Sequence, residues 1–229
     1  MIETSNRTDP RELPAYTARE AAHYLRVPVA TARYWCVGRD DYLPLIEVAA
    51  RDPVLLSFLN LVELHVLASI RRKHRVSMPK VREAIDWLRE RTDNRHDRRH
   101  PLVSRALETD GIDLFTERYG RLVNVNRDGQ VVMREVLGDA LRRIERDDHG
   151  IPVKLYPYTR SSVNDAPTLV VIDPRLAGGR PVLTGTGLAT EMIAERYKAG
   201  ESVEALAKDY EREEAEIEEA LRCEIGLAA

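Results

Sequence analysis

The sequence contains two cysteines, few aromatic residues and no long apolar run. Cys36 and Cys223 lie far apart, which excludes a disulfide framework like that of small secreted proteins. No apolar stretch approaches the ~20 residues that a membrane-spanning helix needs, and the first residues lack the pattern of a signal peptide. We therefore expect a cytoplasmic protein that does not enter a membrane.

The sequence also lacks a strong net charge, because 35 Lys and Arg nearly balance 38 Asp and Glu. This balance hides an asymmetry: residues 71–105 carry 12 basic and 5 acidic side chains, whereas residues 190–224 carry 5 basic and 12 acidic ones. A basic middle predicts contact with nucleic acid, and an acidic end predicts a different, basic partner. Charge alone, however, favours solvated helix faces over either partner.

Two short helices joined by a tight turn are predicted near the amino terminus. Thr17 and Glu20 have the spacing of a capping box, which predicts a helix over 17–25. A valine-proline-valine sequence interrupts it, and a second helix over 29–36 ends before Gly38. This arrangement has the shape of a helix-turn-helix.

A wing-like loop over 40–53 follows, with strand candidates at Tyr42, Leu43, Leu45 and Ile46. Apolar residues at helical spacing then predict a long helix over 54–73. Ser77 is placed to cap a helix over 78–91. Residues 92–101 have no apolar side chain except proline, which predicts a basic linker.

The pattern changes in the remaining sequence. We predict strands at 112–115, 122–125, 130–133 and 151–158, a turn at 126–129 and a helix at 135–147. After a second linker, strands are predicted at 169–172 and 181–183, and helices at 188–199, 202–210 and 213–224. The fold class is therefore α+β and mostly helical: a winged helix-turn-helix, a small middle region of β-hairpin and helix, and a final β-hairpin with a three-helix, helix-turn-helix-like unit.

An ordered set of residues marks the first ninety positions. It comprises Tyr16-Thr17, Val27, Thr31, Arg33-Tyr34-Trp35, Asn60 to Leu64, Ile70-Arg71, Val76-Ser77, Val81-Arg82 and Ile85. Over residues 15–91 this set resembles the DNA-binding domain of MerR-type regulators. The resemblance implies that the second helix enters the major groove. The residues that we expect to contact DNA are Thr17, Arg19, Thr31, Arg33 and Tyr34.

The chemistry of these side chains suits DNA. Arg33 can pair in a bidentate manner with phosphate or guanine, and the Tyr34 hydroxyl can donate to a phosphate. The alternative is a helix hairpin used only for packing, with Tyr34 and Trp35 as core aromatics; Trp35 we assign to the core. After residue 91 the polar linker replaces the long coil of MerR-type dimers, which argues against drug or metal sensing.

A second ordered set lies near the carboxy terminus. It runs Val171-Ile172-Asp173-Pro174-Arg175, Gly178-Gly179-Arg180-Pro181-Val182-Leu183, Gly185-Thr186, Ala199-Gly200-Glu201-Ser202 and Asp209-Tyr210. Over about residues 168–225 it is similar to domain of unknown function 433 (DUF433), found in antitoxins of VapB type. The sequence departs from that family at Gly187, where members usually carry an arginine; Arg175 and Arg180 are the nearest substitutes.

The resemblance implies the antitoxin of a VapBC-like toxin–antitoxin pair. Such a protein binds and silences a PIN-domain-like ribonuclease and represses its own operon by binding operator DNA as a homodimer. The alternative is a MerR-like transcription regulator with no toxin, in which residues 102–160 bind an effector or a protein. Genomic neighbourhood and co-purification distinguish the two.

Other candidate sites give weaker signals. Arg95, Arg98 and Arg99 are placed either to neutralise phosphates or to enter the acidic pocket of a nuclease. His96, Asp97 and His100 have metal-ligand spacing, but without a helix signal or nearby cysteine they favour a solvated loop. Gly185-Thr186-Gly187 is too short for a nucleotide-binding fingerprint. No nucleophile or triad motif appears, so we expect neither an enzyme nor a cofactor.

These observations divide the chain into six parts. We predict a flexible amino terminus (1–14), the helix-turn-helix domain (15–91), the basic linker (92–101), an α+β middle region (102–160), a second linker (161–167) and the DUF433-like module (168–229).

Overall fold

The computed structural model describes residues 9–39, 42–72, 77–104, 107, 111–123, 127–160 and 166–225. In chain order its elements are α1 (Ala18–Tyr24), α2 (Val29–Val37), β1 (Ala50–Arg51), β2 (Val54–Leu55), α3 (Phe58–Arg72), α4 (Met78–Glu90), α5 (Arg95–Arg99), α6 (Ile112–Val123), α7 (Arg127–Leu141), β3 (Ile144–Arg146), β4 (Pro152–Leu155), β5 (Val170–Val171), the 3-10 turn η2 (Ala177–Gly179), β6 (Val182–Leu183), α8 (Thr190–Lys198), α9 (Val203–Asp209) and α10 (Glu214–Ile225). The predicted α+β, mostly helical class is confirmed.

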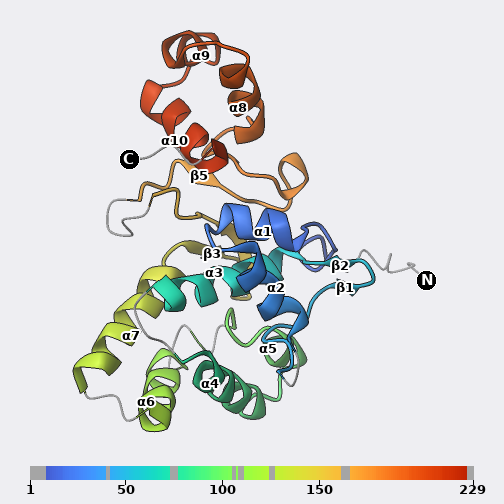
Figure 1. Ribbon diagram of the computed structural model, residues 1–229, viewed down its shortest axis with the longest axis vertical. Coiled ribbons are helices and arrows are strands. Elements are labelled where there is room, and N and C mark those ends of the chain that lie inside the picture. The colour runs from blue at the N-terminus through green and yellow to red at the C-terminus, as the bar shows by residue number, and fades with distance from the viewer. Residues whose placement is uncertain are drawn as a thin grey trace.

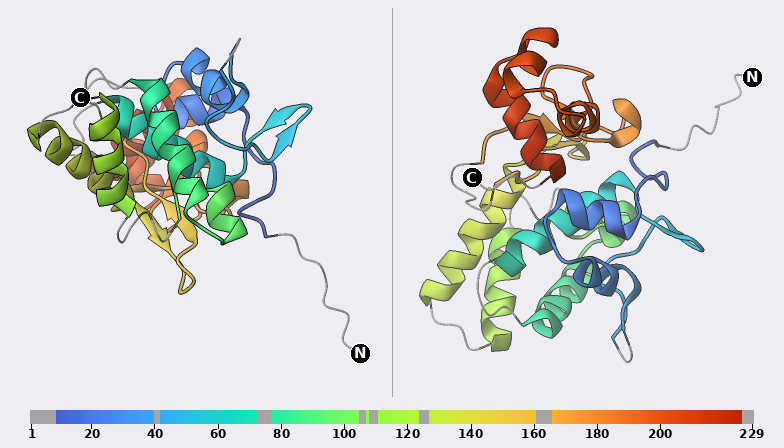
Figure 2. Two further views of the ribbon diagram at one scale, coloured as in Figure 1. Left: turned by 90° about the horizontal axis from the view of Figure 1, so that it is seen from below. Right: turned by 45° about the horizontal axis from the view of Figure 1, so that its top comes forward.

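The helices dominate the arrangement, and the strands form small antiparallel hairpins β1–β2, β3–β4 and β5–β6. Helices α8 to α10 occupy one end of the molecule, α6 and α7 occupy the other, and α1 and α3 lie between them (Figures 1 and 2). Among the described residues, no helix is long and apolar enough to cross a membrane.

Helices α1 and α2 form where the sequence predicts them. The Thr17 hydroxyl accepts from the Glu20 backbone N–H, and the Glu20 carboxylate accepts from the Thr17 N–H, so the expected capping box is present. Helix α2 ends at Gly38, whose φ of +82° is costly for other residues and whose missing Cβ leaves room for the Tyr42 carbonyl. Trp35 is fully buried, as expected.

The wing is displaced from its predicted position. Leu45 and Ile46 form no strand; both are buried, and their backbone N–H groups donate to the Trp35 carbonyl at 2.8 and 3.3 Å. The observed hairpin is β1–β2, so α3 begins four residues later than expected. Its first turn is stabilised by reciprocal hydrogen bonds between Ser57 and Asn60, a start signal that the hydrophobic spacing does not reveal. Residues 40 and 41 lie outside the described part.

The predicted basic linker over 92–101 contains helix α5. Asn94 caps it by accepting from the backbone N–H groups of His96 and Asp97. The segment is anchored because His100, after its last turn, is buried. Ser77 occupies the capping position of α4 as expected, but its side chain makes no capping hydrogen bond.

In the middle region the structure has helices where the sequence predicts strands. The expected strands at 112–115, 122–125 and 130–133 belong to helices α6 and α7, except for residues 124–126, which are not described. The expected turn at 126–129 is helical from Arg127 onward. The expected helix over 135–147 ends at Leu141, after which β3 pairs with β4. Helical spacing is the physical reason: α6 buries Phe115 and Tyr119, one turn apart.

Two apolar cores build the fold. The larger one spans α1 to α7 and the adjoining strands, and the smaller one joins α8, α9 and α10 to β5 and β6. Ile193, Leu206, Ile217 and Leu221 are fully buried in the smaller core. Paired backbone hydrogen bonds of 3.0 and 2.8 Å between Leu155 and Ile172, both in the larger core, connect β4 to the residue that follows β5.

A buried contact also joins α1 to the carboxy-terminal end. The Tyr16 hydroxyl donates to the Gly179 carbonyl at 2.8 Å, and a Cβ at Gly179 would lie 2.4 Å from that hydroxyl. Arg26, after α1, donates to the Arg222 carbonyl in α10. The helix pair is therefore fixed to the DUF433-like module. We call the Tyr16–Gly179 contact the tyrosine lock.

Candidate nucleic-acid interface

Helix α2 has one buried and one exposed face. Ala32, Trp35 and Cys36 are buried against the larger core. Val29, Arg33 and Val37 recur every four residues and are exposed on the other side. The exposed face is therefore an arginine flanked by two valines at one-turn spacing.

The exposed face of α2 borders a hollow of about 500 Å³, which we call the α1–α2 hollow. Its lining residues are Thr17, Ala18, Arg19, Val29, Arg33, Val37 and Val54. Two of these are arginines and none is a carboxylate. Neither Arg19 nor Arg33 makes an ion pair or side-chain hydrogen bond to any residue that the structure describes. The hollow thus presents two arginines without an ion-pair partner among the described residues, and Arg19 also borders an adjacent hollow lined by Glu20, Glu191 and Glu224.

The predicted DNA-contacting residues fall into two groups. Thr17, Arg19 and Arg33 come together around the α1–α2 hollow, although the Thr17 hydroxyl is engaged with Glu20 at 2.7 Å. Thr31 and Tyr34 are half-buried and do not line it, and the Tyr34 ring lies edge-on against Tyr42 with centroids 6.5 Å apart.

Sequence reasoning missed four residues of the hollow: Ala18, Val29, Val37 and Val54. The spacing of Val29 and Val37 around Arg33 was the available signal for two of them. Val54 reaches the hollow from β2, in the displaced wing, so its position depends on tertiary structure.

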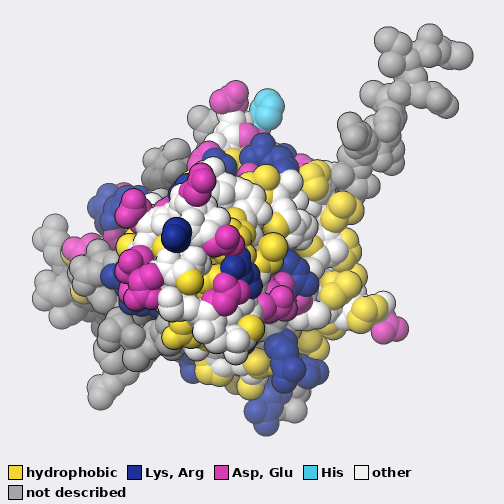
Figure 3. All heavy atoms as spheres, turned by 90° about the horizontal axis from the view of Figure 1, so that it is seen from above, with side chains coloured by type: hydrophobic (Ala, Val, Ile, Leu, Met, Phe, Trp, Pro, Cys, Tyr) yellow, Lys and Arg dark blue, Asp and Glu magenta, His cyan; other side chains and the backbone are white. Residues whose placement is uncertain are grey.

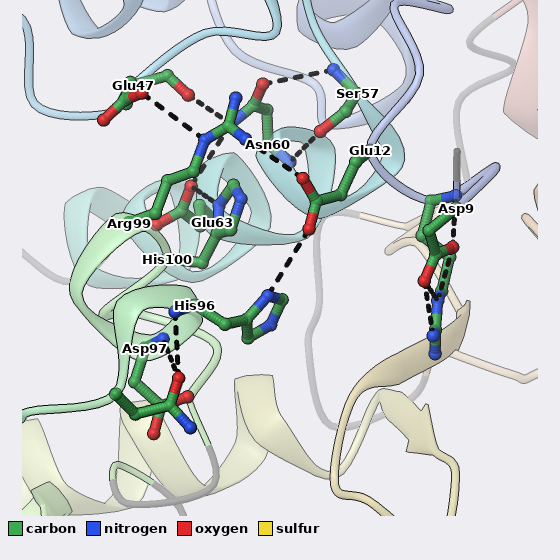
Figure 4. A network of polar contacts seen from close by, with 12 residues as sticks. Asp9, Glu12, Glu47, Ser57, Asn60, Glu63, His96, Asp97, Arg99 and His100 are labelled. Carbon is green, nitrogen blue, oxygen red and sulfur yellow. Dashed lines mark hydrogen bonds and ion pairs between the residues drawn. The ribbon is translucent and has the colours of Figure 1, made fainter. Parts of the chain in front are cut away.

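The predicted arginines of α5 differ in their availability. Arg99 pairs with Glu12 at 3.0 Å and with Glu47 at 3.4 Å, and His96 approaches Glu12 at 3.6 Å (Figure 4). Arg99 therefore holds the amino-terminal segment against α5. Arg95 and Arg98 are exposed, and Arg98 donates to the Thr92 carbonyl at 3.0 Å.

The candidate metal cluster is divided by burial. His100 points into the core, where its Nδ1 lies 3.0 Å from the Glu63 carboxylate; both side chains are at most 1% exposed. The other nitrogen of His100 and the other oxygen of Glu63 have no hydrogen-bond partner among the residues that the structure describes. Within the described part of the chain, no three His, Cys, Asp or Glu side chains are arranged to hold a metal ion.

Both predicted arginines of the carboxy-terminal module are in ion pairs. Arg175 contacts the buried Asp173 at 2.7 Å, and this pairing holds the pKa of Asp173 below its usual value despite burial. Arg180 contacts Glu191 at 3.0 Å. Acidic and basic side chains are interspersed on the outer face of this module (Figure 3). The outer face of this module therefore carries charges of both signs, whereas the α1–α2 hollow is lined by basic side chains without carboxylates.

The two cysteines are unsuited to nucleophilic chemistry. Burial raises the pKa of the Cys36 thiol to about 12 and raises that of Cys223 further. Because the thiolate is the nucleophile, both side chains act as small packing groups.

Comparison with known proteins agrees with the C-terminal resemblance. Residues 170–222 match the family model DUF433, described as "Protein of unknown function (DUF433)". The chain is 29% identical over 225 residues to "Putative antitoxin VapB45" of Mycobacterium tuberculosis, covering 87% of this chain and 89% of the relative. It is 26% identical to "Uncharacterized protein Rv2308" of the same organism, covering 90% of this chain and 88% of the relative.

A solved structure has a similar fold. The crystal structure of Rv2018 from Mycobacterium tuberculosis superposes with a TM-score of 0.69 at 27% sequence identity, covering 91% of this chain and 98% of that one. The similarity thus includes both halves of the fold and is not confined to the matched segment. The chain is thus similar to the DUF433 family over residues 170–222 and to Putative antitoxin VapB45 over most of its length.

Proposed function

We propose that this chain is a non-enzymatic antitoxin of a VapBC-like pair that acts in the cytoplasm. In this proposal it binds a PIN-domain-like ribonuclease toxin and represses its own operon by binding operator DNA. The similarity to a relative named as an antitoxin, over 87% of this chain, supports the role. The α1–α2 hollow supports the DNA-binding part.

The observation that carries DNA binding is the pair of exposed arginines without carboxylate partners among the described residues. A DNA duplex carries one negative charge per ~1.7 Å of its axis, so such a surface gains affinity by releasing counterions. In our proposal α2 enters the major groove and Arg33 reaches guanine or phosphate. Two copies read half-sites about 34 Å apart, or a multiple of that distance.

For the toxin-binding surface, ion pairing within the chain separates the predicted arginines. Arg95 and Arg98 are exposed near the end of the basic region, whereas Arg99, Arg175 and Arg180 are engaged with carboxylates. We assign toxin contact to Arg95 and Arg98, whose charge suits the acidic, metal-binding pocket of such a nuclease.

Co-expression tests the toxin role. The product of the neighbouring gene is expressed with the wild type, with the Arg95→Ala/Arg98→Ala variant, and with Arg121→Ala as a control in α6. We expect growth rescue and co-purification with the wild type and the control, and loss of both with the double variant. An adjacent product that neither binds the wild type nor becomes less toxic refutes the antitoxin role.

A DNA-binding regulator without a toxin is the second candidate. It is favoured by the position of the α1–α2 hollow, which is formed by α1, α2 and β2 alone. If the wild type shifts its own promoter fragment while failing the co-expression test, this second candidate replaces the first.

A further inference from the structure

The exposed valines of α2 are unusual for a solvent-facing helix surface. Val29 is 42% exposed and Val37 is 50% exposed, although each is an apolar, β-branched residue that disfavours an exposed helix position. They flank Arg33 at one turn on either side and line the same hollow. This face combines methyl groups with one guanidinium.

One occupant matches that combination. In the major groove, guanine offers two acceptors that a guanidinium can bind, and thymine projects a methyl group at C5 that apolar side chains contact. Neutral apolar partners would use the valines and leave the arginines without a counter-charge. A protein partner with acidic residues would satisfy the arginines, but α2 is the second of two short helices joined by a tight turn, and in this arrangement the second helix enters the major groove.

We propose that Val29 and Val37 determine the base specificity of this chain by contacting thymine methyl groups on either side of the base that Arg33 reads. The inference rests on the proposed DNA-binding function and refines it. An α-helix rises 1.5 Å per residue, so Val29 and Val37 lie about 12 Å apart along α2. Stacked base pairs are about 3.4 Å apart, and the two contacts therefore fall about three to four base pairs apart, less where the helix is inclined to the groove.

The expected effect follows from the size of a methyl group. Removing one such group from water contributes about 0.8 kcal/mol, which corresponds to a fourfold change in affinity. Replacing a contacted thymine by uracil removes only the C5 methyl. We therefore expect each critical dT→dU replacement to weaken binding by about fourfold.

The experiment uses the full chain and duplexes selected from a random library by repeated binding. We expect a selected half-site with a guanine and flanking thymines. Binding is then measured by fluorescence anisotropy for the dT duplex and its dU counterparts, with wild type, Val29→Ala, Val37→Ala and Val131→Ala. Val131 is the matched control because it is also 50% exposed but lies on α7.

The decisive result is that the effects of a valine variant and of the dU replacement on the binding free energy do not add. A valine variant should lose affinity for the dT duplex and lose its sensitivity to the dU replacement at its own thymine, while Val131→Ala behaves as wild type. The inference is overturned if dU and dT duplexes bind wild type equally, or if the selected half-site lacks thymine beside the guanine. It is also overturned if the valine variants change the oligomeric state in sedimentation without altering dU sensitivity.

Failure of the parent proposal gives a different result. If wild type selects no duplex above the background of an Arg19→Ala/Arg33→Ala variant, DNA binding by this face is refuted, and the thymine inference with it. If Arg33→Ala weakens binding while dU has no effect, DNA binding stands and the thymine inference alone is refuted.

Discussion

Replacing Gly179 by alanine tests whether the tyrosine lock stabilises the fold. Gly179 has φ +83°, and a Cβ there would lie 2.4 Å from the Tyr16 hydroxyl and 3.2 Å from its ring carbon Cζ. The left-handed backbone alone costs an alanine about 1–2 kcal/mol. Displacing the buried hydroxyl also breaks its hydrogen bond to the Gly179 carbonyl, which costs about another 1–3 kcal/mol. We expect Gly179→Ala to lower the free energy of unfolding by about 2–5 kcal/mol.

Gly178 provides the control. Its φ is +64°, and a Cβ there meets nothing within 4 Å, so Gly178→Ala carries the backbone cost alone. Urea denaturation followed by tryptophan fluorescence, to which the buried Trp35 contributes, measures both variants. The Tyr16→Phe variant removes the hydroxyl that the new Cβ approaches. Gly179→Ala should therefore cost less in that background than in wild type. If Gly179→Ala and Gly178→Ala are equally destabilising, the lock is not a stabilising contact.

Three further predictions concern other charged or titratable side chains. Burial lowers the pKa of His65 to about 3, below its unfolded value of 6.5. The unfolded chain therefore binds the proton first, and stability is lost as the pH falls below 6.5, by about 1.4 kcal/mol per unit for this group. Urea titrations from pH 7 to 4.5 should show a shallower decline for His65→Gln, and equal declines would refute the assignment. Glu63→Ala leaves the buried His100 without its partner and should cost about 3 kcal/mol, whereas Glu63→Gln, which can still hydrogen-bond, costs less; equal losses in calorimetry would contradict the pairing. Arg33→Ala should weaken duplex binding and reduce the slope of log K against log salt by about 1, and an unchanged slope in anisotropy titrations would place the phosphate contact elsewhere.

The sequence was most informative where start and stop signals are local. The capping box of α1, Gly38 after α2 and the Ser202 cap of α9 depend on hydrogen bonds or backbone angles within a few residues, and each is observed. The capping residues Asn94 and Ser57 have the same chemistry. Asn94 lies in the segment whose composition predicts a linker, and Ser57 lies inside the predicted helix over 54–73, so neither residue is used as a start signal.

The strands predicted in the middle region are wrong for a different reason. Short apolar runs such as Ile112 to Phe115 fit a strand or one turn of a helix equally well. The tertiary environment decides between them, because α6 packs on α4 and α7 and buries Phe115 and Tyr119 at helical spacing. The sequence over 126–129 predicts a turn, but from Arg127 onward these residues belong to helix α7.

The candidate site was predictable in part. Arg19 and Arg33 were identified from helix position, and the structure brings them to one hollow. Arg99 was grouped with Arg95 and Arg98 by sequence, but its two carboxylate partners, Glu12 and Glu47, come from distant segments that no local pattern connects to it. The separation of exposed from occupied arginines therefore required the fold.

The tyrosine lock constrains how the two ends of this protein can be recombined. A hybrid that joins the first half of one relative to the last half of another has to supply both the aromatic hydroxyl and a residue without a side chain opposite it. A side chain in place of Gly179 would overlap the tyrosine, and a smaller residue in place of Tyr16 would leave a void at this contact. Exchanging the amino-terminal and carboxy-terminal parts between homologues should therefore succeed only when this pair is exchanged as a unit.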